Sequence, residues 1–184
     1  MKSRFFPLAS LFFEFGSQRL EDYSAEKPIL DLRTFLNGPL VGAGVFVGLS
    51  GRVEQHFSLD MRASWSGESG LLEEDCYYND GTRGQRNWNF RFVDNSTFTA
   101  TSEDVEGEAQ GGQCGNAAVM RYRYRIKRSG KADIVVSMDD WFYLMQNNVM
   151  INRVRMSKFG LKVGELTAAY YHQPTAESVD PSSP

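Results

Sequence analysis

The stretch Met120-Arg121-Tyr122-Arg123-Tyr124-Arg125-Ile126 alternates between apolar or aromatic side chains and basic ones. Successive side chains of a β-strand point to opposite faces, so this pattern predicts a strand with an aromatic inner face and a basic outer face. The same period of two runs through residues 56–65 and 87–92. Strands with one apolar and one polar face are typical of an antiparallel sheet that covers a core on one side.

Turn-forming residues divide the chain beyond Leu40 into strands. Ser50-Gly51, Asp80-Gly81 and Ser129-Gly130 are pairs that tolerate the positive φ angles of tight hairpins. The predicted strands are 40–48, 52–65, 71–79, 83–93, 97–103, 117–127, 132–145, 149–158 and 161–171. The Gly- and acid-rich stretch 104–116 is either a short further strand or a long loop.

Long strands joined by tight hairpins predict an all-β fold, a single antiparallel up-and-down β-barrel of about eight to ten strands. The chain shows no crossover-helix pattern, which excludes a parallel α/β sheet. One short helix is expected at 31–36, where Asp31 caps the first turn and Asn37-Gly38-Pro39 ends it. A barrel of this size has either a filled core or a cavity for one small ligand.

The composition excludes several functional classes. The chain has 184 residues, of which 41% are hydrophobic and 23% charged. This is the usage of one globular domain and neither of a disordered chain nor of a polytopic membrane protein. A net charge of −3 gives no field that would recruit nucleic acid. The two His and two Cys lack ligand spacing, so no metal site or other cofactor is predicted.

The two ends of the chain differ from the body. Residues 1–20 begin like an export signal, but the apolar run contains Pro7 and Glu14 and is too short for a membrane-spanning helix. No small-residue cleavage site and no lipid-bearing Cys follows it. We expect 1–20 to be an N-terminal arm or a degenerate export or anchor segment, 21–171 to be the barrel, and the Pro-, Ser- and acid-rich 172–184 to be a disordered tail.

A series of short motifs runs along the body of the chain. They are LDLR (30–33), FLNGPL (35–40), GRV (51–53), DM (60–61), SWSG (64–67), GLLEE (70–74), DVEGEAQG (104–111), DDWFYL (139–144), INR (151–153), MSKFG (156–160) and VGE (163–165). From Glu21 to Tyr171 this series resembles a bacterial family of lipocalin-like lipoproteins without an assigned activity. The segments INR and MSKFG carry the most specific part of the resemblance.

The resemblance implies a calycin-type β-barrel exported to the cell envelope. Genes of this family tend to lie near genes for fatty-acid modification, which associates the family with lipid. Two features depart from the family pattern. Typical members carry a lipid-bearing Cys after the signal, and the lipocalin Gly-x-Trp signature is replaced here by Gly42-Ala43-Gly44.

The inward phase of the predicted strands gathers aromatic and long apolar side chains, and a neighbouring strand pair adds basic ones. The predicted ligand-binding residues are Phe57, Met61, Trp65, Trp88, Phe90, Tyr122, Tyr124, Trp141, Arg153 and Lys158. No catalytic residue is predicted. Arg153 is expected either to stack on Trp141 and lock two strands or, like Lys158, to bind the carboxylate of a fatty acid.

The remaining polar clusters are expected on the outside of the barrel. Arg121, Arg123 and Arg125 should form a solvated face opposite acidic side chains, or contact anionic lipid headgroups. The acidic run Glu73-Glu74-Asp75 is likewise interpreted as a solvated strand face. Cys76 and Cys114 are either paired or two free thiols.

The sequence thus predicts a non-catalytic protein that binds or carries an apolar small molecule, a fatty acid or lipid. The expected location is in or near the bacterial envelope, with the cytoplasm as the alternative. The expected partners are the lipid and a membrane surface, not nucleic acid. Two alternatives stay open: an enzyme that acts on a lipid held in the barrel, and a filled barrel used as a protein-interaction module. A closed core would exclude carriage, and a purely apolar cavity would exclude catalysis.

Overall fold

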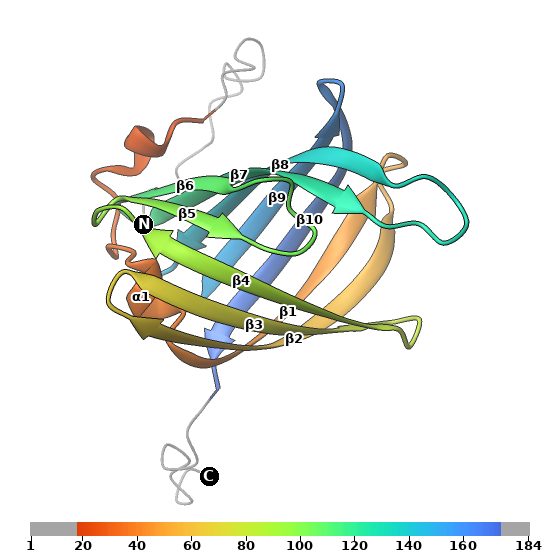
Figure 1. Cartoon of the computed structure of the whole chain (residues 1–184). Helices are drawn as coiled ribbons and strands as arrows, with labels where there is room; N and C mark the ends of the chain where they lie inside the picture. The colour runs from red at the N-terminus through yellow and green to blue at the C-terminus, as the bar shows by residue number, and fades with distance from the viewer. Residues whose placement is uncertain (1–17, 174–184) are drawn as a thin grey trace, which may run out of the picture.

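The computed structural model describes residues 18–173, and within this range ten antiparallel strands close into one barrel in up-and-down order (Figure 1). The strands are β1 (Gly38–Gly48), β2 (Val53–Ser66), β3 (Ser69–Tyr78), β4 (Arg83–Phe92), β5 (Thr97–Thr101), β6 (Ala109–Cys114), β7 (Ala117–Ile126), β8 (Ile134–Leu144), β9 (Met150–Lys158) and β10 (Leu161–His172). β1 closes the barrel by pairing with β10. The predicted fold class is therefore confirmed. Most of the predicted N-terminal arm and C-terminal tail lies outside the described residues.

The alternation in β7 has the predicted consequence. Tyr122 is buried, whereas its neighbours Arg121 and Arg123 are exposed. The outer arginines meet acidic side chains: Arg121 Nε lies 2.8 Å from Asp139 Oδ1, and Arg123 Nε lies 3.0 Å from Glu106 Oε2. The predicted basic outer face opposite acidic residues is confirmed. In a strand whose side chains alternate, these arginines point away from the core when the tyrosines between them point into it.

The ambiguous stretch 104–116 contains both a loop and a strand. Its second part forms β6, and its first part runs along β7, where Glu106 N donates to Arg123 O at 2.9 Å and Arg125 N donates to Asp104 O at 2.8 Å. Meanwhile β4 pairs with β5 only from Asn89 to Phe92. The first half of β4 therefore has no backbone pairing with the loop that runs along β7. We call this gap in the backbone pairing the β4–β7 seam.

A short helix closes one end of the barrel. The helix α1 (Leu32–Phe35) follows the 3-10 turn η2 (Leu20–Tyr23), and Asp31 caps it by accepting a hydrogen bond from Arg33 N at 2.9 Å. Leu32 and Phe35 are buried under it. The predicted helix is confirmed, and its apolar side chains form the floor of the barrel.

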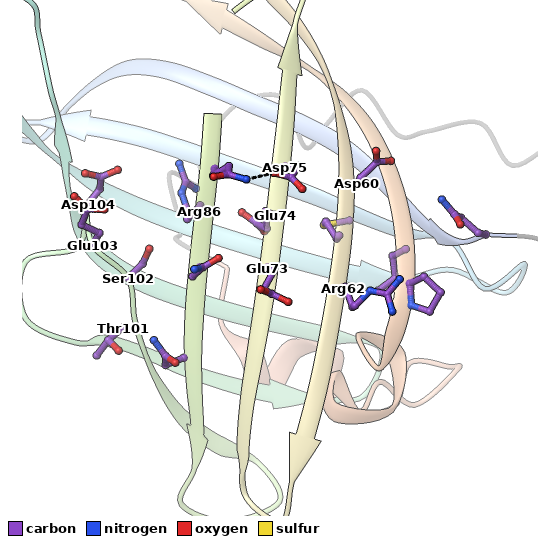
Figure 2. A pocket seen from close by; sticks show the side chains of 17 residues that line it. Asp60, Arg62, Glu73, Glu74, Asp75, Arg86, Thr101, Ser102, Glu103 and Asp104 are labelled. Carbon is purple, nitrogen blue, oxygen red and sulfur yellow. Dashed lines mark hydrogen bonds between the residues drawn. The ribbon is translucent and has the colours of Figure 1, made fainter. Parts of the chain in front are cut away.

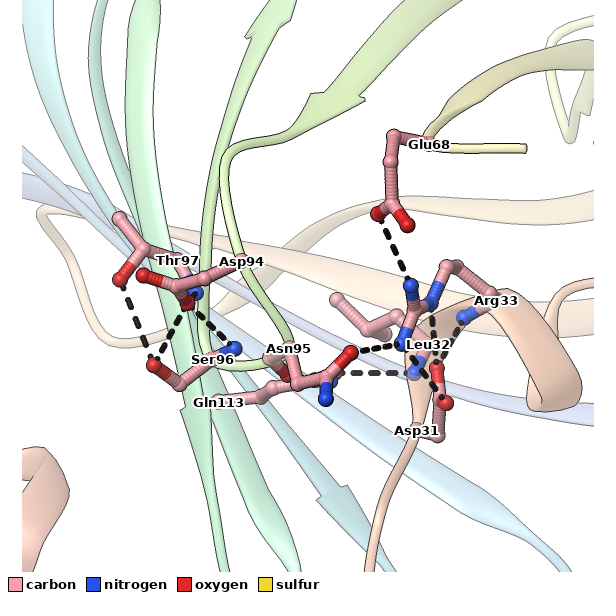
Figure 3. Close-up of polar contacts among 9 residues, drawn as sticks. All are labelled: Asp31, Leu32, Arg33, Glu68, Asp94, Asn95, Ser96, Thr97 and Gln113. Atoms are coloured by element: carbon pink, nitrogen blue, oxygen red, sulfur yellow. Dashed lines mark hydrogen bonds and ion pairs between the residues drawn. The ribbon is translucent and has the colours of Figure 1, made fainter.

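Gln113 on β6 ties this floor to the strands (Figure 3). Its Oε1 accepts a hydrogen bond from Leu32 N at 3.0 Å, and its Nε2 donates to Asn95 O at 2.8 Å. Arg33 adds an ion pair to Glu68 on the β2–β3 turn at 3.0 Å. We call this the closed end. In residues 18–173 no helix crosses the opposite end, which we call the open end (Figure 1).

The half of the barrel nearer the closed end is densely packed. Phe98 is fully buried, and its ring lies 5.1 Å from that of Phe92 and 5.8 Å from that of Phe90. Gly111 on β6 makes this packing possible, since a Cβ there would lie 2.2 Å from the Phe98 ring. Among the described residues, no helix has the length and apolarity to cross a membrane.

Candidate functional site: an internal cavity

An internal cavity of about 360 Å³ lies inside the barrel. It extends from Leu32 and Leu36 at the closed end to Phe46, Tyr78 and Met156 towards the open end. Its volume falls in the range of roughly 300–1,000 Å³ that is usual for small-molecule sites. Most of the wall is aliphatic or aromatic, because the inward phase of the long strands carries these side chains. A completely filled barrel is therefore excluded.

The cavity brings together six of the ten predicted ligand-binding residues. They are Phe57, Met61, Trp88, Phe90, Tyr122 and Tyr124. The other four, Trp65, Trp141, Arg153 and Lys158, do not line it. Trp65 packs at the closed end, with its ring 5.8 Å from that of Phe92.

Trp141 and Arg153 lie opposite each other on β8 and β9, on the outer face of the wall. Trp141 is nevertheless buried, because the N-terminal Tyr23 covers it with its ring 5.8 Å away. The predicted stacking of Arg153 on Trp141 is wrong: the cation over Trp141 is Arg121, 5.7 Å from the ring centre. Arg153 instead donates to Glu165 Oε1 at 2.8 Å, a neighbour that single-strand patterns do not reveal.

A buried hydrogen-bond network forms one polar patch of the cavity wall. Asp140 accepts hydrogen bonds from Asn152 Nδ2 at 2.5 Å and from Tyr122 OH at 3.2 Å. Tyr170 OH donates to Asn152 Oδ1 at 2.8 Å. Burial raises the pKa of Asp140 to about 7, although the bonds from Asn152 and Tyr122 oppose this rise. Asp140 thus changes charge near neutral pH.

A second polar patch consists of Glu74 on β3 and Arg86 on β4. Arg86 Nη2 donates to Tyr124 OH at 2.9 Å. Burial raises the pKa of Glu74, and the charge of Arg86 opposes the shift. Burial works against the charge of Arg86, but the carboxylate of Glu74 raises its pKa further above its usual range. Arg86 therefore stays charged, and it is the sole Lys or Arg among the described residues that line the cavity.

The interpretation of the run 73–75 as a solvated face is wrong for its middle residue. Glu73 and Asp75 point outward, whereas Glu74 has the inward phase of Leu72 and Cys76. The sequence signal for an inward Glu74 is a charged residue at a position whose neighbours two residues away are apolar. The same pattern occurs at Arg86, between Gly84 and Trp88, and at Asp140, between Met138 and Phe142.

The Glu74–Arg86 pair also borders a groove on the outside of β2, β3 and β4, lined mainly by acidic and amide side chains. Figure 2 shows Arg86 beside β4, with Glu103 and Asp104 across from it on the segment that runs along β7. Glu74 and Arg86 each line both the outer groove and the internal cavity. At the β4–β7 seam, the Arg86 side chain therefore separates the internal cavity from the outer groove.

The cysteines are two free thiols. Cys76 lines the cavity, and burial raises the pKa of its thiol. Cys114 ends β6 near the closed end. In the described part of the chain, no group of three or more His, Cys, Asp or Glu side chains is arranged to hold a metal ion.

Solved structures with the same architecture share little sequence with this chain. Rv2717c from M. tuberculosis superposes with a TM-score of 0.56 at 13% identity, covering 81% of this chain and 99% of that one. The S-type phycobiliprotein lyase CPES from Guillardia theta superposes with a TM-score of 0.55 at 4% identity, covering 86% of this chain and 99% of that one. At such identities the likeness is one of fold, a calycin-like β-barrel.

The sequence comparison is more specific. No curated protein sequence matches this chain significantly. Residues 9–172 match the family described as "Protein of unknown function (DUF3833)", a match that includes the whole barrel. The chain therefore belongs to the DUF3833 family, and its described part is a calycin-like barrel with an internal cavity suited to a small hydrophobic ligand.

Proposed function

We propose that the barrel binds and carries a small amphiphile with one acidic headgroup, a fatty acid or a related lipid. The observation that carries this proposal is a single half-buried guanidinium, Arg86, in a cavity whose wall is mostly aliphatic and aromatic. Such a wall buries a hydrocarbon chain by the hydrophobic effect. A planar guanidinium binds a carboxylate through paired hydrogen bonds.

Charge balance favours an anionic ligand over a neutral one. A buried cation needs a counter-charge. Glu74 supplies it from the facing position on β3, but burial raises the pKa of Glu74 and favours its neutral form. A ligand carboxylate at Arg86 would replace the charge of Glu74, which then takes up a proton. Ligand binding should therefore weaken as the pH rises above the pKa of Glu74.

Calorimetric titration with lauric acid and with lauryl alcohol tests the role of Arg86. The two ligands share the hydrocarbon chain and differ in the headgroup. We expect Arg86→Met to bind lauric acid about tenfold or more weakly and to keep its affinity for the alcohol, because it loses only charge-assisted bonds. The control is Arg83→Met on the same strand, whose side chain is exposed. Equal losses for both ligands would contradict the proposal.

The natural occupant is best identified in protein purified from its own host. Native mass spectrometry followed by lipid extraction should show an acidic lipid bound to the wild type and less of it on Arg86→Met. Cell fractionation of the same host tests the proposed location in or near the envelope. A protein that carries no lipid and is not stabilised by any fatty acid would contradict carriage.

A second candidate, an enzyme that acts on the bound lipid, is favoured by one observation. Asp140 has a pKa raised to about 7 and accepts a hydrogen bond from Tyr122 in the same cavity. A carboxyl group with such a pKa suits general acid–base catalysis at neutral pH. Turnover of a lipid ester that Asp140→Asn abolishes while lauric acid still binds would support this candidate over simple carriage.

A further inference from the structure

Four apolar side chains project from two neighbouring hairpins at the open end. Leu49 and Val53 lie on the β1–β2 hairpin with 77% and 47% of their surface exposed, and Phe159 and Leu161 lie on the β9–β10 hairpin with 93% and 72% exposed. The hairpins are adjacent because β1 pairs with both β2 and β10. Single exposed apolar residues are ordinary, but a group of four at one rim marks an interaction surface. We call these four residues the apolar rim.

Phe159 is unsuited to its backbone position. Lys158 pairs with Leu161, so Phe159 and Gly160 form a two-residue turn with φ angles of 51° and 79°. A turn with two positive φ angles favours Asn-Gly, and a bulky aromatic residue is disfavoured at its first position. With 93% of its surface exposed, the ring gains almost no packing in return. Within the described residues the ring has Lys158 Nζ over it, 5.5 Å from its centre, an exposed contact that contributes little. An external apolar partner would account for a phenylalanine here.

Basic residues surround the apolar rim. Arg52, Lys158 and Lys162 lie on the same two hairpins, and Arg128 and Lys131 lie on the β7–β8 hairpin, which follows because β8 pairs with β9. Lys162 is paired with Glu165. Within residues 18–173, no ion pair engages the other four of these basic residues, in a chain whose net charge is −3.

Both ends of the barrel carry exposed acids. Glu54 and Asp133 lie on the hairpins of the open end, and Glu21, Asp22, Glu68 and Asp94 lie on η2 and the turns of the closed end. Exposed apolar side chains occur at the closed end too, among them Ile29 at 55%, Val93 at 69% and Met145 at 44%, but they lie on separate segments of the chain. In the described part of the chain, basic residues outside any ion pair occur at both ends, since Lys27 and Arg91 lie at the closed end. At the open end, which no helix of residues 18–173 covers, four such residues surround the apolar rim.

We propose that the open end docks onto the anionic surface of a lipid bilayer. The apolar rim enters the boundary between headgroups and acyl chains, and Arg52, Arg128, Lys131 and Lys158 contact lipid phosphates. The basic residues around the rim favour an anionic surface. Phe159 and Leu161 protrude and offer no groove for a partner's side chains, which favours a lipid bilayer over an acidic soluble protein. Docking in this orientation turns the open end of the barrel towards the lipid phase. It goes beyond ligand binding in the cavity and does not require it.

Co-sedimentation of the full chain with lipid vesicles tests the docking. One vesicle preparation contains phosphatidylcholine and phosphatidylglycerol in equal parts, and the other contains phosphatidylcholine alone. We expect binding to the anionic vesicles that falls steeply with added salt, and at least about fivefold weaker binding to the neutral ones.

Phe159→Asn is the informative variant, since Asn-Gly suits the turn better than Phe-Gly and should keep or raise the melting temperature. It should weaken vesicle binding about tenfold, the factor expected for the loss of one inserted aromatic side chain. The matched control, Val93→Asn, removes an exposed apolar side chain at the closed end and should change nothing. The pair Arg128→Gln and Lys131→Gln should weaken binding to anionic vesicles and flatten its salt dependence.

Several outcomes would overturn the docking proposal: binding to neither vesicle preparation, equal binding to both, or the same loss for Val93→Asn as for Phe159→Asn. Capture of an acidic protein by the apolar rim without vesicle binding would also overturn it. The proposed function of the cavity is tested separately, by lauric acid binding to the wild type and to Arg86→Met. A protein that binds vesicles but no lauric acid would refute the cavity function and support the docking.

Discussion

Arg86 on β4 and Tyr124 on β7 are joined by a hydrogen bond of 2.9 Å between strands that do not pair with each other. The guanidinium carbon also lies 4.9 Å from the centre of the Tyr124 ring. Backbone hydrogen bonds hold the rest of the barrel wall, but here, at the β4–β7 seam, side chains alone connect the two sides. The same guanidinium is the proposed partner of the ligand headgroup. One residue thus contributes both to the wall and to the proposed ligand site.

Removal of the Tyr124 hydroxyl should loosen the seam. Tyr124→Phe deletes the acceptor of a charge-assisted hydrogen bond and should lower the free energy of unfolding by about 1–3 kcal/mol. Urea unfolding followed by tryptophan fluorescence measures the change. The control is Tyr77→Phe on the outer face of β3, for which we expect a change within about 0.5 kcal/mol. Similar values for the two variants would show that the seam bond contributes nothing to stability.

Asp140 should make the stability of the barrel depend on pH. Its pKa is raised from 3.8 to about 7, so between these values the folded state binds a proton that the unfolded state releases. The free energy of unfolding contributed by this group is then highest below pH 3.8 and falls as the pH rises towards 7, by at most about 1.4 kcal/mol per pH unit. Asp140→Asn removes this dependence.

The measurement is the stability difference between wild type and Asp140→Asn at several pH values, because the other titrating groups largely cancel in that difference. The variant should gain relative to the wild type as the pH rises from 5 to about 7. A difference that stays constant over this window would show that Asp140 is already ionised in the folded protein. Asp139→Asn, on the outer face of the same strand, is the control.

Gln113 should be a strong determinant of the closed end. Gln113→Met keeps the length of the side chain but leaves Leu32 N and Asn95 O without their partners. The unpartnered Leu32 N is buried, and the lost bond to Asn95 O is partly buried, so the free energy of unfolding should fall by about 2 kcal/mol. Gln110→Met, an exposed position on the same strand, should be nearly neutral. Thermal unfolding of both variants decides the matter, and equal melting temperatures would contradict this role.

Cys76 offers a chemical probe of the cavity. Burial raises the pKa of its thiol, which lowers the thiolate fraction at neutral pH and slows alkylation by iodoacetamide. In the Cys114→Ser background, lauric acid should slow the labelling of Cys76 further by occupying the cavity. In the Cys76→Ser background, the labelling of Cys114 should not respond to lauric acid. Labelling of Cys76 at an unchanged rate with saturating fatty acid would place the ligand elsewhere.

Much of the fold was predictable because its signals are local. The period of two in 120–126 determines which side chains of β7 face the core, and the turn-forming pairs mark where the hairpins reverse. The cap at Asp31 needs only residues close in sequence. The aromatic lining of the cavity followed from the same periodicity, which is why Phe57, Trp88 and Tyr122 were correctly placed on the inner face.

The polar part of the site was less accessible to sequence reasoning. The alternation shows that Glu74 and Asp140 point inward, but it does not show which side chains they contact inside the barrel. Trp141 and Arg153 carried a plausible local pattern, yet they lie on the outer face because their phase is that of Asp139 and Arg155. Short acidic and basic runs are ambiguous without the register of the neighbouring strand.

The sequence by itself determined the strands, their inner and outer faces, the hairpins and the short capped helix, since each depends on interactions within a few residues. Only the tertiary structure decided that the barrel contains a cavity, and that Arg86, Glu74 and Asp140 share it. Arg86 and Tyr124 are 38 positions apart and belong to strands that do not pair, so closure of the barrel alone brings them together. Closure also placed the hairpins that carry Leu49 and Phe159 next to each other, because β1 meets β10 only in the closed barrel.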